Sequence, residues 1–148
     1  MFKISVFAII FNAENQVLLN HRRDYDLWNL PGGRLNDNEN PKKGVHREVK
    51  EEVGISIAIT RLGHIYYRPL QQNIVFTFIC HQTKGTLSLS DEADAVGYFS
   101  LSDLPKNLIP THKQRILDVI AEPLPSMKEE TDYSLADIVK RLKKRVSL

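Results

Sequence analysis

Three glutamates occupy one face of a predicted helix. Glu48, Glu51 and Glu52 stand at i, i+3 and i+4, so their carboxylates should lie side by side. Like charges at this spacing repel, and Arg47 alone cannot balance three anions. A hard divalent cation such as Mg²⁺ or Mn²⁺ could balance them, because such ions prefer carboxylate oxygens and bridge them to phosphate. The spacing therefore indicates metal-dependent phosphate chemistry, with a solvated acidic helix face as the alternative.

The helix that carries these glutamates is predicted to begin at Pro41 and end at Val53. Asn40 is a typical N-cap residue, and proline is tolerated at the first helical position because its missing N–H has no helical partner there. Gly54 is a typical C-terminal stop. Gly44 lies inside the helix and is expected either to leave room for metal-bound water or phosphate, or to be a tolerated substitution. The buried side is predicted from Val45, Val49 and Val53.

Apolar runs on both sides of this helix predict a mixed β-sheet. Residues 4–11 and 16–22 are joined by a polar loop and predict two antiparallel strands. A short extended piece at 27–30 ends in Pro-Gly-Gly at 31–33, where the backbone can approach a ligand closely. Further strands are predicted from β-branched and aromatic residues at 55–59, 63–67, 74–80, 86–89 and 95–99.

The C-terminal part predicts two amphipathic helices and a linker. Apolar residues recur at helical spacing over 111–121 and again over 134–148, where five lysines and arginines make the last helix basic. Residues 122–133 contain two prolines and predict a linker. The chain is thus expected to be one α/β domain over 1–148, with a core over about 1–121. The basic helix is expected to dock on its own domain or on a second subunit, which makes a homodimer one expected assembly.

Bulk composition excludes several classes of protein. The chain has 148 residues, a formal net charge of +2 and one cysteine. No stretch approaches the roughly 20 apolar residues that span a bilayer, and the main body lacks the basic footprint of a nucleic-acid-binding domain. Cys80 cannot form an internal disulfide, so we expect a cytoplasmic protein in which this thiol is a buried strand residue.

A longer motif surrounds the three glutamates. The segment GRLNDNENPKKGVHREVKEEVGI, residues 33–55, fits GX5EX7REUXEEXGU, with U a bulky aliphatic residue, at every specified position. This pattern resembles the signature box of the Nudix hydrolases. The resemblance implies the Nudix fold, a mixed sheet sandwiched between helices, and hydrolysis of a diphosphate linkage with Mg²⁺ or Mn²⁺. The implied substrates are nucleoside diphosphate derivatives such as ADP-ribose, nucleotide-sugars or modified nucleoside triphosphates.

The same resemblance implies roles for residues of the box. Glu51 and Glu52 look like metal ligands, and Glu48 looks like a further ligand or the general base. Arg47 and Glu39 are similar to residues that orient these carboxylates in the family. A base within hydrogen-bond reach of the attacking water would typically contribute about 10² to 10⁴-fold in rate.

Residues outside the helix complete the predicted site. The Gly32 carbonyl is similar to a further metal ligand in the family, and Gly33 is expected where the backbone meets the substrate. Glu92 resembles a second glutamate that many family members place several residues before an aromatic strand, although two neighbouring aspartates compete for that role. The base that accepts a proton from water is therefore expected to be Glu92 or Glu48.

Three further residues are candidates for binding the rest of the substrate. Arg23, with its neighbour Arg22, could bind a phosphate, and Trp28 could stack on a base. Pro69 resembles, by its distance from Gly54, a proline of the ADP-ribose pyrophosphatase branch. The ordinary alternatives are a solvated strand end for the arginines, core packing for the tryptophan and a turn for the proline.

Two other functions are compatible with the same fold. A Nudix-like binding module would sense a nucleotide without turnover, but such modules tend to lose the helix glutamates, and this sequence retains all of them. A prenyl diphosphate isomerase would need an active-site cysteine context that Cys80 lacks. Hydrolysis is favoured accordingly.

Overall fold

The computed structural model describes residues 1–130 and 138–140. A five-stranded sheet has the order β4-β1-β6-β5-β8, and a three-stranded sheet has the order β3-β2-β7. The strands are β1 (Lys3–Ile10), β2 (Val17–Arg22), β3 (Trp28–Asn29), β4 (Gly32–Arg34), β5 (Ser56–Arg68), β6 (Asn73–Lys84), β7 (Ala93–Phe99) and β8 (Met127–Glu129). The helices are α1 (Pro41–Val53) and α2 (Pro110–Ala121). Since β1 pairs in parallel with β6 and antiparallel with β4, the large sheet is mixed, as predicted.

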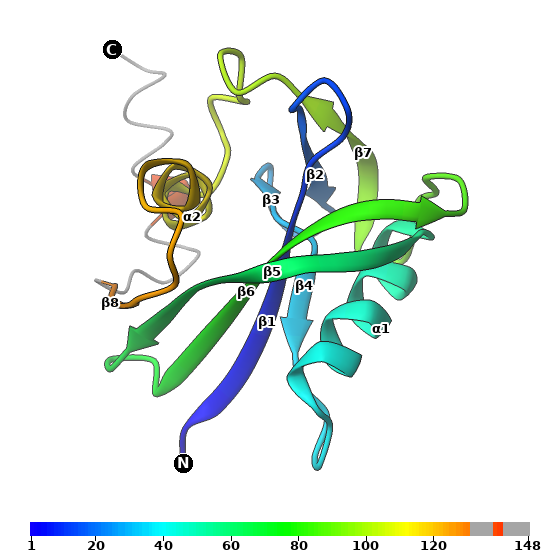
Figure 1. Ribbon diagram of the computed structural model, residues 1–148. Coiled ribbons are helices and arrows are strands. Elements are labelled where there is room, and N and C mark those ends of the chain that lie inside the picture. The colour runs from blue at the N-terminus through cyan, green and yellow to red at the C-terminus, as the bar shows by residue number, and fades with distance from the viewer. Residues whose placement is uncertain (131–137, 141–148) are drawn as a thin grey trace.

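The large sheet lies between the two helices, which confirms the predicted α/β sandwich (Figure 1). Alternate residues of β1 point to opposite faces of the sheet. Val6, Ala8 and Ile10 pack in one apolar cluster with the three valines of α1. Ile9 packs in a second cluster with Ile116 of α2. Each helix is thus held on its own face by apolar burial, which is worth about 25 cal/mol per Å².

The first two strands do not form the antiparallel pair that the sequence predicts. β1 belongs to the large sheet and β2 to the small one, and in the described part of the chain a single bridge, Phe11 to Val17, joins their ends. The loop between them turns as expected, with Asn12 N–H donating to Gln16 O at 3.0 Å. However, β4 and β6 occupy both edges of β1. Because no edge is free, β2 pairs with β3 and β7 instead.

Two other strand predictions need correction. The two strands predicted at 55–59 and 63–67 are replaced by one strand over residues 56–68, whose pairing with β6 shifts register at several points. Residues 86–89 form no strand. Their backbone follows the end of α1, where Ser88 N–H donates to Val53 O at 3.0 Å and Leu87 packs on the α1 cluster. A tertiary contact with a helix end has overridden strand propensity in this segment.

Helix α1 has the predicted limits. The Asn40 side chain accepts a hydrogen bond from the backbone N–H two residues later at 2.8 Å, and Gly54 ends the helix with a left-handed φ of 82°. The proposal that Gly44 makes room for water or phosphate is wrong. A Cβ on Gly44 would lie 2.1 Å from Leu35 Cδ2 and 3.1 Å from Glu39 Oε1. The glycine instead lets the preceding loop pack directly on the helix backbone.

The segment after α2 contains more than the predicted linker. β8 pairs in parallel with β5, and Ser126 N–H donates to Nδ1 of the buried His64 at 3.0 Å. Ile138 is buried against Leu27 and Ile109. The predicted basic helix over 134–148 lies largely outside the described residues. Within residues 1–130 and 138–140, no helix is long and apolar enough to cross a membrane.

Candidate active site

Three carboxylates meet where α1 faces the loop before β7. One oxygen each from Glu48, Glu52 and Glu92 lies within 4.8 Å of the other two. Glu48 and Glu52 come from adjacent turns of α1, whereas Glu92 immediately precedes β7. The tertiary fold therefore joins two glutamates of the helix with one that is distant in the sequence.

Glu52 is the most deeply buried of the three, with 5% relative exposure. One carboxylate oxygen accepts from Asn20 Nδ2 at 2.8 Å, and the other accepts from Gly32 N–H at 3.0 Å. Burial, opposed by these hydrogen bonds and reinforced by the charges of Glu92 and Glu48, raises the pKa of Glu52 to about 7. Because these oriented anions lack an equal positive charge, the donor set fits a hard divalent cation.

Arg47 contacts the outer side of the same helix face. Its guanidinium donates to Glu39 at 2.7 and 2.8 Å, to Glu48 at 3.2 Å and to Glu51 at 3.0 Å. The hydrogen bonds from Arg47 and from Asn36 N–H lower the pKa of Glu39 to about 2. Glu51 itself is 61% exposed, and none of its oxygens belongs to the three-carboxylate group. The Arg47 guanidinium therefore restrains all three of these carboxylates. Glu51, the most exposed of them, stands at the rim of the site.

Two glycines of β4 allow close packing, Gly33 against the carboxylate cluster and Gly32 against β1. A Cβ on Gly33 would stand 2.8 Å from one oxygen of Glu48, so a larger residue would displace that carboxylate. A Cβ on Gly32 would stand 2.2 Å from the Val6 carbonyl oxygen, and its φ of 154° is one that other residues rarely adopt. Close approach thus explains both glycines, whereas the metal-ligand role of the Gly32 carbonyl stays a prediction.

A cavity of about 650 Å³ opens beside the carboxylates. Its walls combine charged, amide and apolar side chains, which suits a ligand with both a charged and an uncharged part. The acidic lining residues are Asp24, Glu52, Asp91 and Glu92, and the basic ones are Arg22, Arg23, Arg34 and Arg68. The apolar lining includes Phe7, Ile109 and Ile138.

Comparison with known proteins places this arrangement in a family. The model of the NUDIX domain matches residues 1–120. The chain belongs to the Nudix family. It is also 32% identical over 120 residues to the "Putative 8-oxo-dGTP diphosphatase" of Bacillus subtilis (strain 168), with 80% of each chain covered.

Solved structures agree with this assignment. A NUDIX hydrolase from Nitrosomonas europaea superposes with a TM-score of 0.80 at 22% identity, over 88% of this chain and 79% of that one, and so supports the fold. An ADP-ribose pyrophosphatase from Streptococcus suis superposes with a TM-score of 0.71 at 27% identity, over 88% and 100% of the two chains. This Nudix protein is thus a hydrolase of phosphorus-containing acid anhydrides. Nudix hydrolases generally use divalent metals, which agrees with the carboxylate cluster.

The predicted substrate-binding residues of this Nudix hydrolase lie in different places. Arg23 lines the cavity, although its Nε donates to the Ser90 carbonyl at 2.8 Å. Trp28 is not part of the lining and packs edge-on against Phe99, with ring centroids 4.9 Å apart. Pro69 is also outside the lining and accepts a turn hydrogen bond. Cys80 is buried, as expected, in the apolar cluster that packs on α1, and burial raises the pKa of its thiol to about 12.

Asn20 is a residue of the site that the sequence analysis missed. It is 1% exposed on β2 and holds one oxygen of Glu52. Asn29 extends the contact, since in the amide orientation that satisfies both of its ends it donates to Asn20 O at 3.0 Å and accepts from Arg22 Nη1 at 3.2 Å. A polar network thus leads from a cavity arginine to the carboxylate cluster. The available signal was an asparagine inside an apolar strand, where a buried amide needs hydrogen-bond partners.

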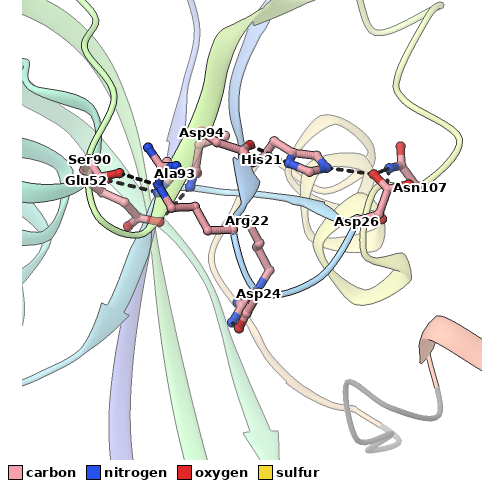
Figure 2. A network of polar contacts seen from close by, with 11 residues as sticks. His21, Arg22, Asp24, Asp26, Glu52, Ser90, Ala93, Asp94 and Asn107 are labelled. Atoms are coloured by element: carbon pink, nitrogen blue, oxygen red, sulfur yellow. Dashed lines mark hydrogen bonds and ion pairs between the residues drawn. The ribbon is translucent and has the colours of Figure 1, made fainter.

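A second polar network connects β2, β7 and the loop after β2 (Figure 2). His21 lies between Asp94, 2.7 Å from Nδ1, and Asp26, 2.8 Å from Nε2. Asn107 donates to Asp26 at 3.0 Å. Although burial lowers the pKa of His21, its hydrogen bonds with Asp26 and Asp94 raise the pKa overall. A protonated ring, which can donate from both nitrogens, therefore holds these segments beside the cavity.

Proposed function

We propose that this Nudix hydrolase cuts a diphosphate linkage in a nucleoside diphosphate derivative and that it requires Mg²⁺ or Mn²⁺. The observation that supports the proposal best is the convergence of Glu48, Glu52 and Glu92 within 4.8 Å beside a cavity that contains arginines. Carboxylates recruit the cation, and arginines offset the remaining charge of the substrate phosphates.

Glu48, Glu52 and Glu92 are the first candidates to hold the metal ion. Glu51 and the Gly32 carbonyl remain predicted additional ligands. A divalent cation bound there would stabilise negative charge on the phosphates and make a bound water more acidic. Asn20 and the Gly32 N–H position Glu52 for this task, because each engages a different oxygen of its carboxylate.

The base that accepts a proton from water is Glu48 or Glu92. Burial raises the pKa of Glu48, although Arg47 at 3.2 Å opposes that change. A raised pKa improves a carboxylate as a proton acceptor. Glu92 is exposed and lines the cavity, so it has easier access to water. A comparison of the pH–rate profiles of Glu48→Gln and Glu92→Gln separates the two: the variant without the base loses the acidic limb of the profile.

The charged part of the substrate is expected to lie near Arg22, Arg23 and Arg34, which line the cavity together with Glu52. Substrate identity rests on resemblance. The Bacillus subtilis relative makes 8-oxo-dGTP a first candidate, and the Streptococcus suis structure makes ADP-ribose a second. Pro69 pointed to ADP-ribose because its distance from Gly54 resembles that of a proline in the ADP-ribose pyrophosphatase branch. Its place outside the cavity lining gives that branch no further support.

The test is hydrolysis of a panel containing 8-oxo-dGTP, dGTP, ADP-ribose and UDP-glucose, with MgCl₂, MnCl₂ or EDTA. Nucleoside monophosphate products are followed by chromatography. Glu52→Gln and Glu51→Gln form a matched pair, since the two side chains are adjacent but only Glu52 belongs to the cluster. We expect metal-dependent product formation that Glu52→Gln abolishes and Glu51→Gln reduces less.

One outcome would favour the binding module instead. If the purified protein bound a nucleotide of this panel tightly but released no product with either metal, catalysis would be excluded for that ligand. The cytoplasmic location and the homodimer remain predictions of the sequence.

A further inference from the structure

His112, in the first turn of α2, has one defined tautomer. The side chain is 7% exposed, and its Nδ1 lies 2.9 Å from the backbone N of Leu30. A backbone N–H can only donate, so Nδ1 must be the acceptor in this contact. The neutral ring therefore carries its proton on Nε2.

The surroundings of His112 favour the neutral ring. Burial lowers the pKa of His112 well below its ordinary value, and the positive charges of Arg115, Arg68 and Arg22 lower it further. The edge of the ring also meets Phe7, with centroids 4.9 Å apart and planes at 72°. His112 is thus a fixed hydrogen-bond donor and not a proton shuttle.

The ring that carries this donor borders the candidate site. His112 lines the same cavity as Glu52 and Glu92. Among residues 1–130 and 138–140, no acceptor is bonded to Nε2. In the same residues, the buried side-chain polar atom without a hydrogen-bond partner is Arg115 Nη1, so Nε2 is not a buried atom without a partner. Nε2 is therefore not sealed in the protein interior. A donor that is fixed by packing and has no acceptor among these described residues is suited to a ligand.

The position of His112 fits the uncharged part of a nucleotide. The N–H of Leu30 fixes the ring, while the N–H of Gly32, two residues later, fixes the Glu52 carboxylate. Both contacts therefore hold side chains of the same cavity in place. Phe7, Ile109 and Ile138 also line the cavity and provide apolar surface for a planar base.

We propose that His112 is a specificity-determining residue that donates a hydrogen bond from Nε2 to an acceptor atom on the base of the nucleotide substrate. This inference rests on the proposed hydrolysis of a nucleotide. It adds that discrimination between bases depends on α2, outside the Nudix box.

The tautomer can be tested without any substrate. In the full-length protein labelled with ¹⁵N at histidine, NMR should show His112 with a protonated Nε2 and an unprotonated Nδ1 across the neutral pH range. The assignment comes from the signal that is lost in His112→Gln. An imidazolium, or a proton on Nδ1, would overturn the proposal.

Two substitutions then separate the two nitrogens of the ring. His112→Asn places an acceptor near Nδ1 and can keep the Leu30 contact, but it removes the cavity donor. His112→Gln places an amide donor near Nε2. On the best substrate of a panel containing the four common deoxynucleoside triphosphates, 8-oxo-dGTP and ADP-ribose, His112→Asn should lower kcat/KM by about tenfold or more, mainly through KM. His112→Gln keeps a donor but loses the acceptor of the Leu30 N–H, so on the same substrate it should recover part of the activity that His112→Asn loses. The matched control is His81→Asn, an exposed histidine on β6.

The ratio of kcat/KM values between substrates with different bases decides the test. We expect His112→Asn to narrow the differences in kcat/KM between bases, while thermal unfolding shows that the variant is folded. A folded His112→Asn with the wild-type preference among bases would refute the role of His112. If the wild type hydrolysed nothing in the panel, the proposed function would fail, and the NMR result would still report on the donor.

Discussion

Two clusters of buried charge, one at α1 and one at α2, differ in how their charges are balanced. At α1, Glu52 is 5% exposed beside two other glutamates and receives hydrogen bonds from neutral amides. At α2, Arg115 is 1% exposed and donates to Glu130 at 3.0 and 2.8 Å. A buried charge costs several kcal/mol unless an opposite charge compensates it. The α2 cluster contains its counter-charge, whereas Glu52 at α1 has neutral donors and no salt bridge in the described part of the chain, which suits the divalent cation proposed above.

This difference separates a structural role from a functional one. Arg68 also pairs with Glu130 at 3.4 Å, and Tyr66 donates to Asp118 of α2 at 2.8 Å. The α2 cluster therefore connects α2 and β5 to the residue that follows β8. At α1, the surplus negative charge opposes folding and favours cation binding. The repulsion among these glutamates thus lowers the stability of the folded chain at the place where the proposed cation would bind.

Removal of the cation at α2 should have the largest effect on stability. Arg115→Met leaves Glu130, which is 8% exposed, without its closest partner. We expect the free energy of unfolding to fall by about 3–5 kcal/mol, measured by urea denaturation. The double variant Arg115→Met/Glu130→Gln should recover part of this loss, because it removes the unpaired anion. Additive losses in the double variant would contradict a balanced pair.

At α1, removal of a charge should have the opposite effect on stability. Glu52→Gln should lower kcat by about 10² to 10³-fold, the scale of one lost electrostatic contact in the transition state. In metal-free buffer above the Glu52 pKa of about 7, its melting temperature should equal or exceed that of the wild type, since a buried anion has gone. Thermal unfolding with and without MgCl₂ provides the check. Equal stabilisation of both proteins by MgCl₂ would place the cation elsewhere.

Loss of the neutral hydrogen-bond donor to Glu52 should reduce activity less than loss of Glu52 itself. Asn20→Leu removes the donor to one carboxylate oxygen. We expect metal affinity or activity to fall by about 10 to 100-fold, as for other groups that orient a metal ligand. Mn²⁺ titration followed by electron paramagnetic resonance measures the affinity directly. Asn20→Asp keeps the shape but replaces the donor with an acceptor, so it should be at least as damaging. Wild-type affinity in Asn20→Asp would rule out this orienting role.

The smallest expected effect concerns His21, a titratable cation between two anions. Its raised pKa means that the folded state binds the proton more tightly than the unfolded state, whose value is near 6.5. The stabilisation is therefore complete below pH 6.5 and is lost as the pH rises through the raised pKa. The melting temperature of wild type relative to His21→Gln should decline over that window. A difference that grew with pH would show that the ring is held neutral.

The limits of α1 and its chemistry were predictable because they depend on neighbours in the chain. Asn40 caps the helix through a contact two residues away, and Gly54 ends it with a left-handed φ. The spacing of the box glutamates is likewise a local property of a helix. Errors appeared where distant segments compete. The strand β2 itself was predicted, but its pairing with β1 was wrong, because the strands that occupy both edges of β1 come from elsewhere in the chain.

The candidate site divides in the same way. The sequence by itself determined the family motif, the helix that carries it and the class of phosphate chemistry, because these depend on residue type and short-range spacing. Only the tertiary structure decided that Glu92 joins Glu48 and Glu52 while Glu51 stays at the rim. It also decided that Asn20 and His112 face the site rather than Trp28 and Pro69. The physical reason is that burial and hydrogen-bond partners depend on long-range packing, which no local pattern specifies.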